Sequence, residues 1–345
     1  MPKNLTSVIG LDIGRYALKS VMMQKKGANR FVVTNFASHI LDESREPTPQ
    51  ELGRGIKSML KQMGSHAKAC AVSVSHPDAL LRLIEQPSTP TDVLRDALKL
   101  NGMMLLNQDT KNYILDCDLI PSSGPSLNGE SDQKTYLVAG LPRVQVNDIG
   151  LAIHEGGAPP VATLQLAPVS MFNAFEFAQP EAFNNSAFFL LDIGHQNSTM
   201  MLGSKKELVL IRSIDFGGKA LIENLQTLSG EDRQTVIHAL DNEDEVMVEN
   251  ARMALMVLTR EIGNSIGFFE GRREEPIRQV WVSGGVAKSK AVMRVLAEEL
   301  RMPCIAWNAA ERCEVSVPAA KKQRFTEEAL DLSVACGAAT EALSA

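Results

Sequence analysis

The stretch VIGLDIGRYALKSVMM, residues 8–23, shares its plan with a second stretch, AFFLLDIGHQNSTMML, residues 187–202. Each stretch has an apolar strand, then Asp-Ile-Gly, then a short polar turn and a second apolar strand. This pattern predicts a β-hairpin whose tip carries a carboxylate, Asp12 or Asp192, and a glycine. Two such hairpins about 180 residues apart indicate a duplicated architecture.

The residue types at the two hairpin tips suit a phosphate group. Gly14 and Gly194 can take positive φ and let backbone N–H groups approach an anion. Asp12 and Asp192 would then lie beside that anion and need a cation between them. Hydrated Mg²⁺ fills this role, since it keeps most of its waters and touches few carboxylates directly. Lys19, on the outgoing strand of the first hairpin, adds a positive charge at the phosphates.

A third element fits the same site. The sequence VWVSGG, residues 280–285, reads as a buried strand that runs into a Gly-Gly turn and then a helix over residues 288–300. A Gly-Gly turn at the start of a helix, here Gly284-Gly285, allows close contact with an adenosine or a phosphate. The two hairpins and this turn, in this order, resemble the actin-like ATPase superfamily, which includes actin, sugar kinases and heat-shock chaperones.

The resemblance implies an α/β, ribonuclease H-like fold with two related domains around a cleft that holds ATP or ADP with Mg²⁺. In the superfamily the hairpins are the phosphate motifs and the Ser-Gly-Gly turn is the adenosine motif. Two helices connect the domains, and their counterparts here are expected at residues 167–177 and 326–343. The second contains ACGAA, residues 335–339, whose small side chains would let two helices pack closely.

An inserted unit follows the proline-bearing sequence PSTP, residues 87–90. A helix is expected over residues 91–101, then two strands over 112–120 and 134–141, and a helix over 144–155. This α-β-β-α unit places the chain in the branch of the superfamily that contains the cell-division protein FtsA and the type IV pilus assembly protein PilM. The pattern of motifs is more similar to the PilM family.

The resemblance divides the chain into four parts. They are a first domain of residues 1–87, 159–180 and 325–345, an inserted subdomain of residues 88–158, a second domain of residues 181–214 and 272–324, and a helical subdomain of residues 215–271.

Another Gly-Gly turn, DFGG at residues 215–218, follows the expected strand over residues 207–214. In the family this turn and its helix lie near the nucleotide, which makes Gly217, Gly218 and Glu223 candidates for phosphate and ribose contacts. The turn could equally be a plain strand-to-helix connection, and this alternative stays open. The complete set expected to contact ATP is Asp12, Gly14, Arg15, Lys19, Asp192, Gly194, Thr199, Gly217, Gly218, Glu223, Gly284 and Gly285, with Asp12 and Asp192 also holding Mg²⁺ through water.

The tip residues depart from the family pattern in ways that bear on activity. Arg15 and Tyr16 stand where PilM-like proteins usually have hydroxyl side chains. The arginine could replace them by charge-assisted hydrogen bonds, and the tyrosine could block the phosphates. Thr199 keeps the hydroxyl position of the second hairpin, whereas a Glu-Lys adenosine clamp has no counterpart in residues 230–244. No further acid is evident for activating water, so hydrolysis is expected to be slow or absent, with nucleotide holding the two domains closed.

Composition limits the classes of partner, the metal and disulfide content, and the cellular location that we expect for this protein. The formal net charge of −6 argues mildly against a nucleic-acid partner, and five cysteines without CxxC spacing suggest neither a zinc site nor disulfides. The N-terminus lacks the layout of a signal peptide, and no apolar run reaches the roughly 18 residues that span a bilayer. A cytoplasmic protein is expected, peripheral to the inner membrane through a partner.

The PilM resemblance implies an ATP-binding adaptor. In that family a groove beside the inserted subdomain receives the cytoplasmic N-terminal tail of the inner-membrane protein PilN, and the pilus assembly ATPases are further partners. Two alternatives remain, a sugar or acetate-type kinase on the same fold and an FtsA-like filament-forming protein. The sequence leaves homo-oligomerisation open.

Overall fold

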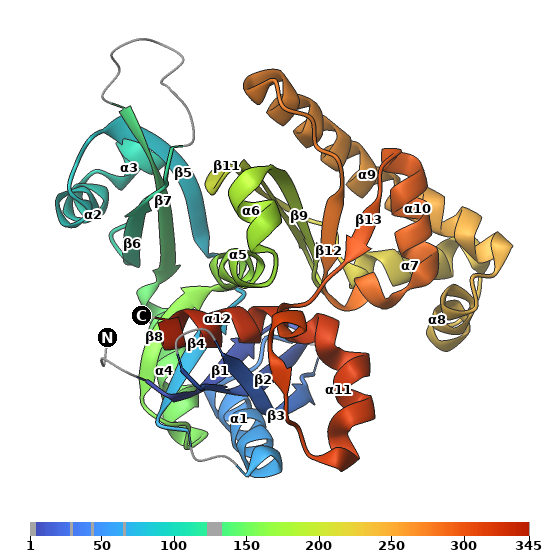
Figure 1. Ribbon diagram of the computed structural model, residues 1–345, viewed down its shortest axis with the longest axis horizontal. Helices are drawn as coiled ribbons and strands as arrows, with labels where there is room; N and C mark the ends of the chain where they lie inside the picture. Colours follow the sequence, from blue (N-terminus) through green and yellow to red (C-terminus); the bar gives the residue numbers. More distant parts are fainter. Residues whose placement is uncertain (1–4, 28–29, 43–44, 65–66, 123–132, 345) are drawn as a thin grey trace.

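The computed structural model describes residues 5–27, 30–42, 45–64, 67–122 and 133–344. Two halves, each built on a mixed β-sheet, meet along a pair of central helices, and a smaller subdomain stands beside them (Figure 1). The expected α/β fold with a duplicated core is confirmed. Most of the loop between the two strands expected in the inserted unit, residues 123–132, lies outside the described residues.

The sheet of the first domain has the strand order β14-β3-β2-β1-β4-β8. Its strands are β1 (Ser7–Ile13), β2 (Ala17–Lys25), β3 (Phe31–Ile40), β4 (Ala69–Val74), β8 (Val161–Leu166) and β14 (Glu314–Val315). β1 pairs antiparallel with β2, as the hairpin pattern predicts, and parallel with β4. Every residue of β4 is buried, which agrees with its largely apolar sequence.

Helix α1 (Pro49–Met63) shows how the sequence fixes local structure in this domain. Thr48 caps the N-terminus and forms a capping box with Glu51, and Gly64 ends the helix in the left-handed conformation. Residues at helical spacing, among them Ile56 and Met59, are buried against the sheet. The second helix on this face is α4 (Arg143–Glu155), which packs beside α1.

The inserted subdomain has a three-stranded sheet of order β5-β7-β6. Its elements are β5 (Leu80–Pro87), α2 (Thr91–Leu100), α3 (Gly102–Leu106), β6 (Tyr113–Leu119) and β7 (Gln133–Pro142). The sheet therefore begins before residue 88, where the sequence placed the start of the unit, because β5 pairs antiparallel with β7 along its whole length. α4, expected at the end of the same unit, instead shares the core of the first domain through Ile149 and Ile153.

The second domain repeats the plan of the first. Its sheet has the order β11-β10-β9-β12-β13, with β9 (Ala187–Ile193), β10 (Ser198–Ser204), β11 (Glu207–Ile214), β12 (Val280–Ser283) and β13 (Cys304–Ala306). β9 pairs antiparallel with β10 and parallel with β12, as β1 does with β2 and β4. The helices of this half are α6 (Pro180–Asn185), α7 (Gly218–Ser229), α8 (Arg233–Asp241), α9 (Glu245–Arg273), η1 (Gly285–Lys288) and α10 (Lys290–Leu300).

Two central helices, α5 (Ala167–Ala178) and α12 (Ser333–Ser344), join the halves (Figure 1). The second was expected as one helix over residues 326–343, but it is broken into α11 (Lys322–Glu328), the 3₁₀ turn η4 (Ala329–Leu332) and α12. The connection before it contains two further 3₁₀ turns, η2 (Ala309–Arg312) and η3 (Ala319–Lys321). The break brings Asp331 to the cleft, beside Lys288.

Glycines let α12 approach both α5 and β1 closely. A Cβ added to Gly337 would lie 1.9 Å from the backbone oxygen of Ser170, and one added to Gly10 would lie 1.9 Å from that of Ala335. No side chain fits at either position. The small residues of the ACGAA sequence therefore pack closely, as expected.

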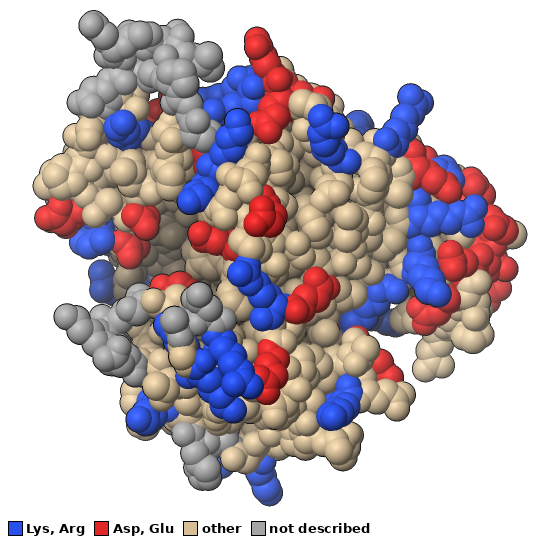
Figure 2. All heavy atoms as spheres, in the orientation of Figure 1, with Lys and Arg blue, Asp and Glu red and all other residues tan. Residues whose placement is uncertain are grey.

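The surface in view carries acidic and basic side chains close together (Figure 2). Charges of opposite sign alternate there, so this face offers a mixed field and no continuous basic track. No helix in the described part of the chain has the length and apolarity needed to cross a bilayer.

The contact at Gly337 gives a stability prediction. Gly337→Ala should lower the free energy of unfolding by roughly 2–4 kcal/mol, because the new methyl group must push α12 away from α5. Thermal and urea unfolding followed by circular dichroism measure this. Gly150→Ala in α4 is the matched control, since a Cβ there meets nothing within 4 Å. An equal effect of the two substitutions would show that the close contact does not limit packing.

Candidate functional site

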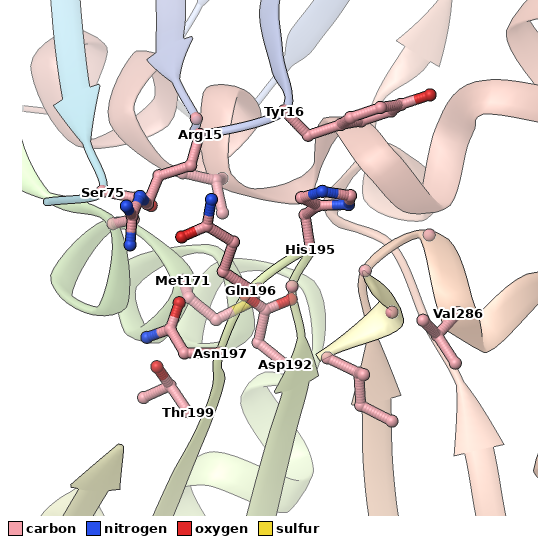
Figure 3. Close-up of a pocket in the computed structure, with 18 of the residues that line it drawn as sticks. Arg15, Tyr16, Ser75, Met171, Asp192, His195, Gln196, Asn197, Thr199 and Val286 are labelled. Atoms are coloured by element: carbon pink, nitrogen blue, oxygen red, sulfur yellow. The ribbon is translucent and has the colours of Figure 1, made fainter. Parts of the chain in front are cut away.

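The two hairpin tips face one cavity of about 1450 Å³ between the domains. Other elements also line it, among them η1, η4 and α8. Figure 3 shows lining residues of both hairpins, such as Arg15 and Thr199, with Val286 of η1. Most of the expected site residues line this cavity together: Asp12, Gly14, Arg15, Lys19, Asp192, Gly194, Thr199, Gly218, Gly284 and Gly285. Two expected members, Gly217 and Glu223, are not part of the lining.

Asp12 and Asp192 occupy equivalent positions at the ends of β1 and β9. Asp12 lies opposite Lys19 in the first hairpin, and Asp192 lies opposite Thr199 in the second. The Ser283 hydroxyl donates a hydrogen bond of 2.9 Å to Oδ1 of Asp192. Asp12 is only 5% exposed, and its Oδ1 has no hydrogen-bond partner. A buried carboxylate oxygen without a partner is unfavourable unless a ligand, an ion or a proton satisfies it.

The electrostatics of the site favour a cation. Burial raises the pKa of Asp12 to about 6, the Lys19 ammonium opposes that shift, and the negative charges of Asp192 and Asp331 add to it. Burial also raises the pKa of Asp192, against the hydrogen bond from Ser283. Three carboxylates thus share one field with Lys19. The described residues contain no cluster of three or more histidine, cysteine or acidic side chains placed to hold a metal.

Gly14 and Gly194 are needed at the hairpin tips because a side chain would not fit there, and not because they take positive φ. Neither Gly14 nor Gly194 has positive φ, so the predicted left-handed geometry is wrong. A Cβ on Gly14 would lie 2.8 Å from the oxygen of Ala17, and one on Gly194 would lie 2.8 Å from that of Asn197. Both tips therefore fold into the same tight turn. Among the glycines that line the cavity, Gly284 has positive φ, at 90°.

Gly217 and Gly218 support the second tip from behind. The N–H of Gly218 donates to the oxygen of Gly194 at 2.9 Å, and the N–H of Lys219 donates to that of His195 at 2.8 Å. These two N–H groups at the start of α7 are therefore used within the protein. Glu223 lies one turn further along α7, 4.0 Å from Lys219 and mostly exposed. Glu223 does not line the cavity, and its expected ribose contact stays a prediction.

Arg15 and Tyr16 each contact another side chain. Arg15 forms an ion pair of 2.7 Å with Glu46. The Tyr16 ring stacks on the His195 ring with centroids 4.5 Å apart and planes at 21° (Figure 3). The stack joins the tip of the first hairpin directly to the tip of the second. Tyr16 therefore bridges the domains at the mouth of the site.

Several lining residues were missed by sequence reasoning. Asp331 of η4 contradicts the expectation that no further acid reaches the cleft, and it is ion-paired with Lys288 of η1. An aspartate in the otherwise apolar run ALDLSVACGAA was a usable signal for it. Arg233 and Asp241 of α8 also line the cavity, in the region where no counterpart of the adenosine clamp was found. Both residues lie on a helix with many exposed polar side chains, and nothing in its sequence indicated that these two reach the cavity.

Comparisons with known proteins agree with this arrangement. Residues 124–343 match the family model of type IV pilus assembly protein PilM. The solved PilM-PilN type IV pilus biogenesis complex is similar, with TM-score 0.81 and 21% identity over 97% of this chain and 98% of that chain. No curated protein matches the chain.

Two further solved structures are similar. Ethanolamine utilization protein EutJ from Carboxydothermus hydrogenoformans has TM-score 0.55 and 13% identity over 100% of this chain and 91% of that one. A Bacteroides thetaiotaomicron protein with an actin-like ATPase fold and unknown function has TM-score 0.50 and 9% identity over 90% and 98%.

The duplicated sheets, the paired hairpin tips and the cavity between them define an actin-like ATPase fold. Since the family model covers well over half of the residues, the chain belongs to the PilM family of type IV pilus assembly proteins.

The raised pKa of Asp12 gives a pH prediction. Because burial raises the pKa of Asp12 in the folded chain to about 6, above its ordinary value of 3.8, the ionised carboxylate destabilises the fold above pH 6. That penalty disappears as the pH falls through this window. Asp12→Asn should therefore raise the unfolding free energy by up to about 3 kcal/mol at pH 7.5 and by little at pH 4. Urea unfolding between pH 4 and 8 measures it, and a gain that does not depend on pH would contradict the assignment.

Proposed function

We propose that this protein is an ATP-binding adaptor of the type IV pilus machinery, located in the cytoplasm. In this proposal MgATP sets how the two domains close, and the inserted subdomain presents a surface to the cytoplasmic N-terminal tail of a PilN-like inner-membrane protein. The observation that carries it is the pair of carboxylates, Asp12 and Asp192, which reach one cavity from equivalent hairpins of the two domains.

The residues present fit a hydrated Mg²⁺. The unpartnered Oδ1 of Asp12 and the neighbouring negative charges of Asp192 and Asp331 favour a positive charge at this point. A site with few direct protein ligands is what Mg²⁺ uses when it binds together with phosphates. Asp12 and Asp192 would hold the ion through its waters, and the ion would neutralise phosphate charge. Lys19 would neutralise a further share from the first hairpin, and Gly284 would let the backbone approach the nucleoside.

Slow or absent hydrolysis is part of this proposal, and the way two of the cleft acids are engaged supports it. Asp331 is ion-paired with Lys288, and Asp192 accepts a hydrogen bond from Ser283. These contacts fix the orientation of both carboxylates and engage their oxygens, so neither is a free base for activating water. Nucleotide then acts mainly as a bridge between the domains, which shifts their open and closed populations.

The partner follows from family membership and from one feature of this chain. The similar solved structure is a complex of PilM with PilN. In this chain the free edge of β5 borders a hollow of about 290 Å³, opposite β11 and the end of α9. An extended tail segment could pair with such an edge strand through its backbone. The assembly ATPases are further candidate partners.

The nucleotide site is tested by binding. Lys19→Gln should weaken MgATP binding at least tenfold in isothermal titration, because a charge at the phosphates is lost. Glu223→Gln is the control and should bind as the unchanged protein does, since Glu223 lies outside the cavity. Equal MgATP affinities of the unchanged protein, Lys19→Gln and Glu223→Gln would show that Lys19 does not contribute to nucleotide binding. Unfolding temperatures without nucleotide confirm that each variant is folded.

The adaptor role is tested with a labelled peptide of a PilN-like cytoplasmic tail. Fluorescence anisotropy should show saturable binding, stronger with MgATP than without it. Leu83→Glu, which places a charge in the hollow beside β5, should weaken binding at least tenfold, whereas Leu119→Glu on β6 should not. A peptide that fails to bind at concentrations of about 100 µM, with or without nucleotide, would refute the adaptor role.

A further inference from the structure

Helix α9 carries apolar side chains on a face that no other part of the described chain covers. The opposite face packs into the second domain through residues such as Leu255, Leu258 and Ile262, all fully buried. The outer face instead exposes Val246 by 71%, Met253 by 54% and Met256 by 66%. The helix lies along the edge of the second domain (Figure 1), and its C-terminal end reaches β5 through the ion pair of Arg272 with Glu85. Three large apolar side chains in a row on one free helix face indicate an interaction surface.

The spacing of this face is that of a two-helix seam. Its positions recur at alternating intervals of three and four residues: Val246, Glu249, Met253, Met256, Arg260 and Gly263. An interval pattern that averages 3.5 residues keeps one stripe of a helix facing a partner helix. We refer to these six residues as the α9 seam.

The α9 seam is complementary to itself when two helices run antiparallel. About a point between Ala254 and Leu255, Glu249 of one copy lies opposite Arg260 of the other. About the same point, Met253 lies opposite Met256, and Val246 lies opposite Gly263. One twofold axis at this point thus places acid opposite base, methionine opposite methionine, and a branched side chain opposite a glycine.

The charged members of the seam are available for such pairing. Within the chain, Glu249 lies 3.4 Å from Arg252, and Arg260 lies 3.9 Å from its neighbour Glu261. Both seam residues are about two-thirds exposed. These are weak surface contacts, and a partner's opposite charge across a seam can replace them.

Gly263 adds a steric argument. It lies inside an exposed helix, where glycine is less stable than alanine by about 1 kcal/mol. A Cβ at Gly263 would meet nothing within 4 Å, so packing inside the chain does not require a glycine there. The same holds for Gly267, one turn further along the helix. Opposite Val246 of a second copy, the missing side chain at Gly263 is a notch that lets the two helices approach closely.

We propose that a second copy of this chain packs antiparallel on the α9 seam and forms a twofold-symmetric dimer. The contact is isologous, since each seam residue and its counterpart occur twice about the axis. One helix per partner buries little surface, so the dimer is weak, with a dissociation constant in the range of about 1–100 µM.

The decisive experiment is a charge exchange measured by sedimentation equilibrium on the full chain. Glu249→Arg and Arg260→Glu should each weaken the dimer roughly tenfold or more, because each places like charges opposite one another twice. The double variant, Glu249→Arg with Arg260→Glu, should restore dimerisation because the pairing is re-formed with the signs reversed. Glu327→Arg on α11 changes the net charge by the same amount away from the seam and should have no effect.

A second variant separates association from folding. Gly263→Leu should keep or raise the unfolding temperature, since the side chain meets open space within the chain, and should abolish the dimer by filling the notch. The proposal is overturned by a chain that stays monomeric up to about 300 µM. It is overturned equally by a double charge variant that fails to recover, or by a Gly263→Leu dimer as strong as the original.

Discussion

The close contact of α12 with α5 and with β1 fixes how the two halves of this protein meet. Gly337 and Gly10 leave no space for a side chain, so the helix axis is set by backbone contact. Around it one apolar core runs through both domains, from Val8 and Met23 of the first sheet to Phe188 of the second. Because each sheet is anchored to this shared core, the ends of β1 and β9 arrive on the same side of it. The site exists because of that placement.

The same placement creates an electrostatically unfavourable cluster. Two carboxylates from equivalent strands share a cleft with Asp331, and burial raises the pKa of Asp12 and of Asp192. A core that held only structural residues would not keep Oδ1 of Asp12 without a partner. Stability lost at such a point is typical of a binding site, whose ligand supplies the missing interactions. The unfavourable electrostatics of the cleft without ligand are thus what the proposed MgATP would relieve on binding.

Local patterns predicted the strands, the hairpins and most helices, because alternation and helical spacing are properties of short stretches of sequence. These local patterns did not predict which sheet each strand joins or which core each helix covers. The strand over residues 80–87 reads the same whether it joins one sheet or another, and only its register with β7 assigns it to the inserted subdomain. An amphipathic helix such as α4 does not reveal which core it covers. The stack of Tyr16 on His195 joins residues from separate hairpins, and no local pattern contains it.

The position of the inserted subdomain suggests how nucleotide and partner could influence one another. The first strand, β5, starts at Leu80, which lines the cavity together with His76 just before it, and its edge faces the second domain at β11. An ion pair of 2.8 Å between Glu85 and Arg272 spans that gap. A change in the angle between the domains must therefore alter the hollow beside β5, because its two walls belong to different halves. If a tail binds there, thermodynamic linkage requires that nucleotide change the affinity for the tail by the same factor as the tail changes the affinity for nucleotide. The coupling would need no moving part beyond the packed helices that already join the domains.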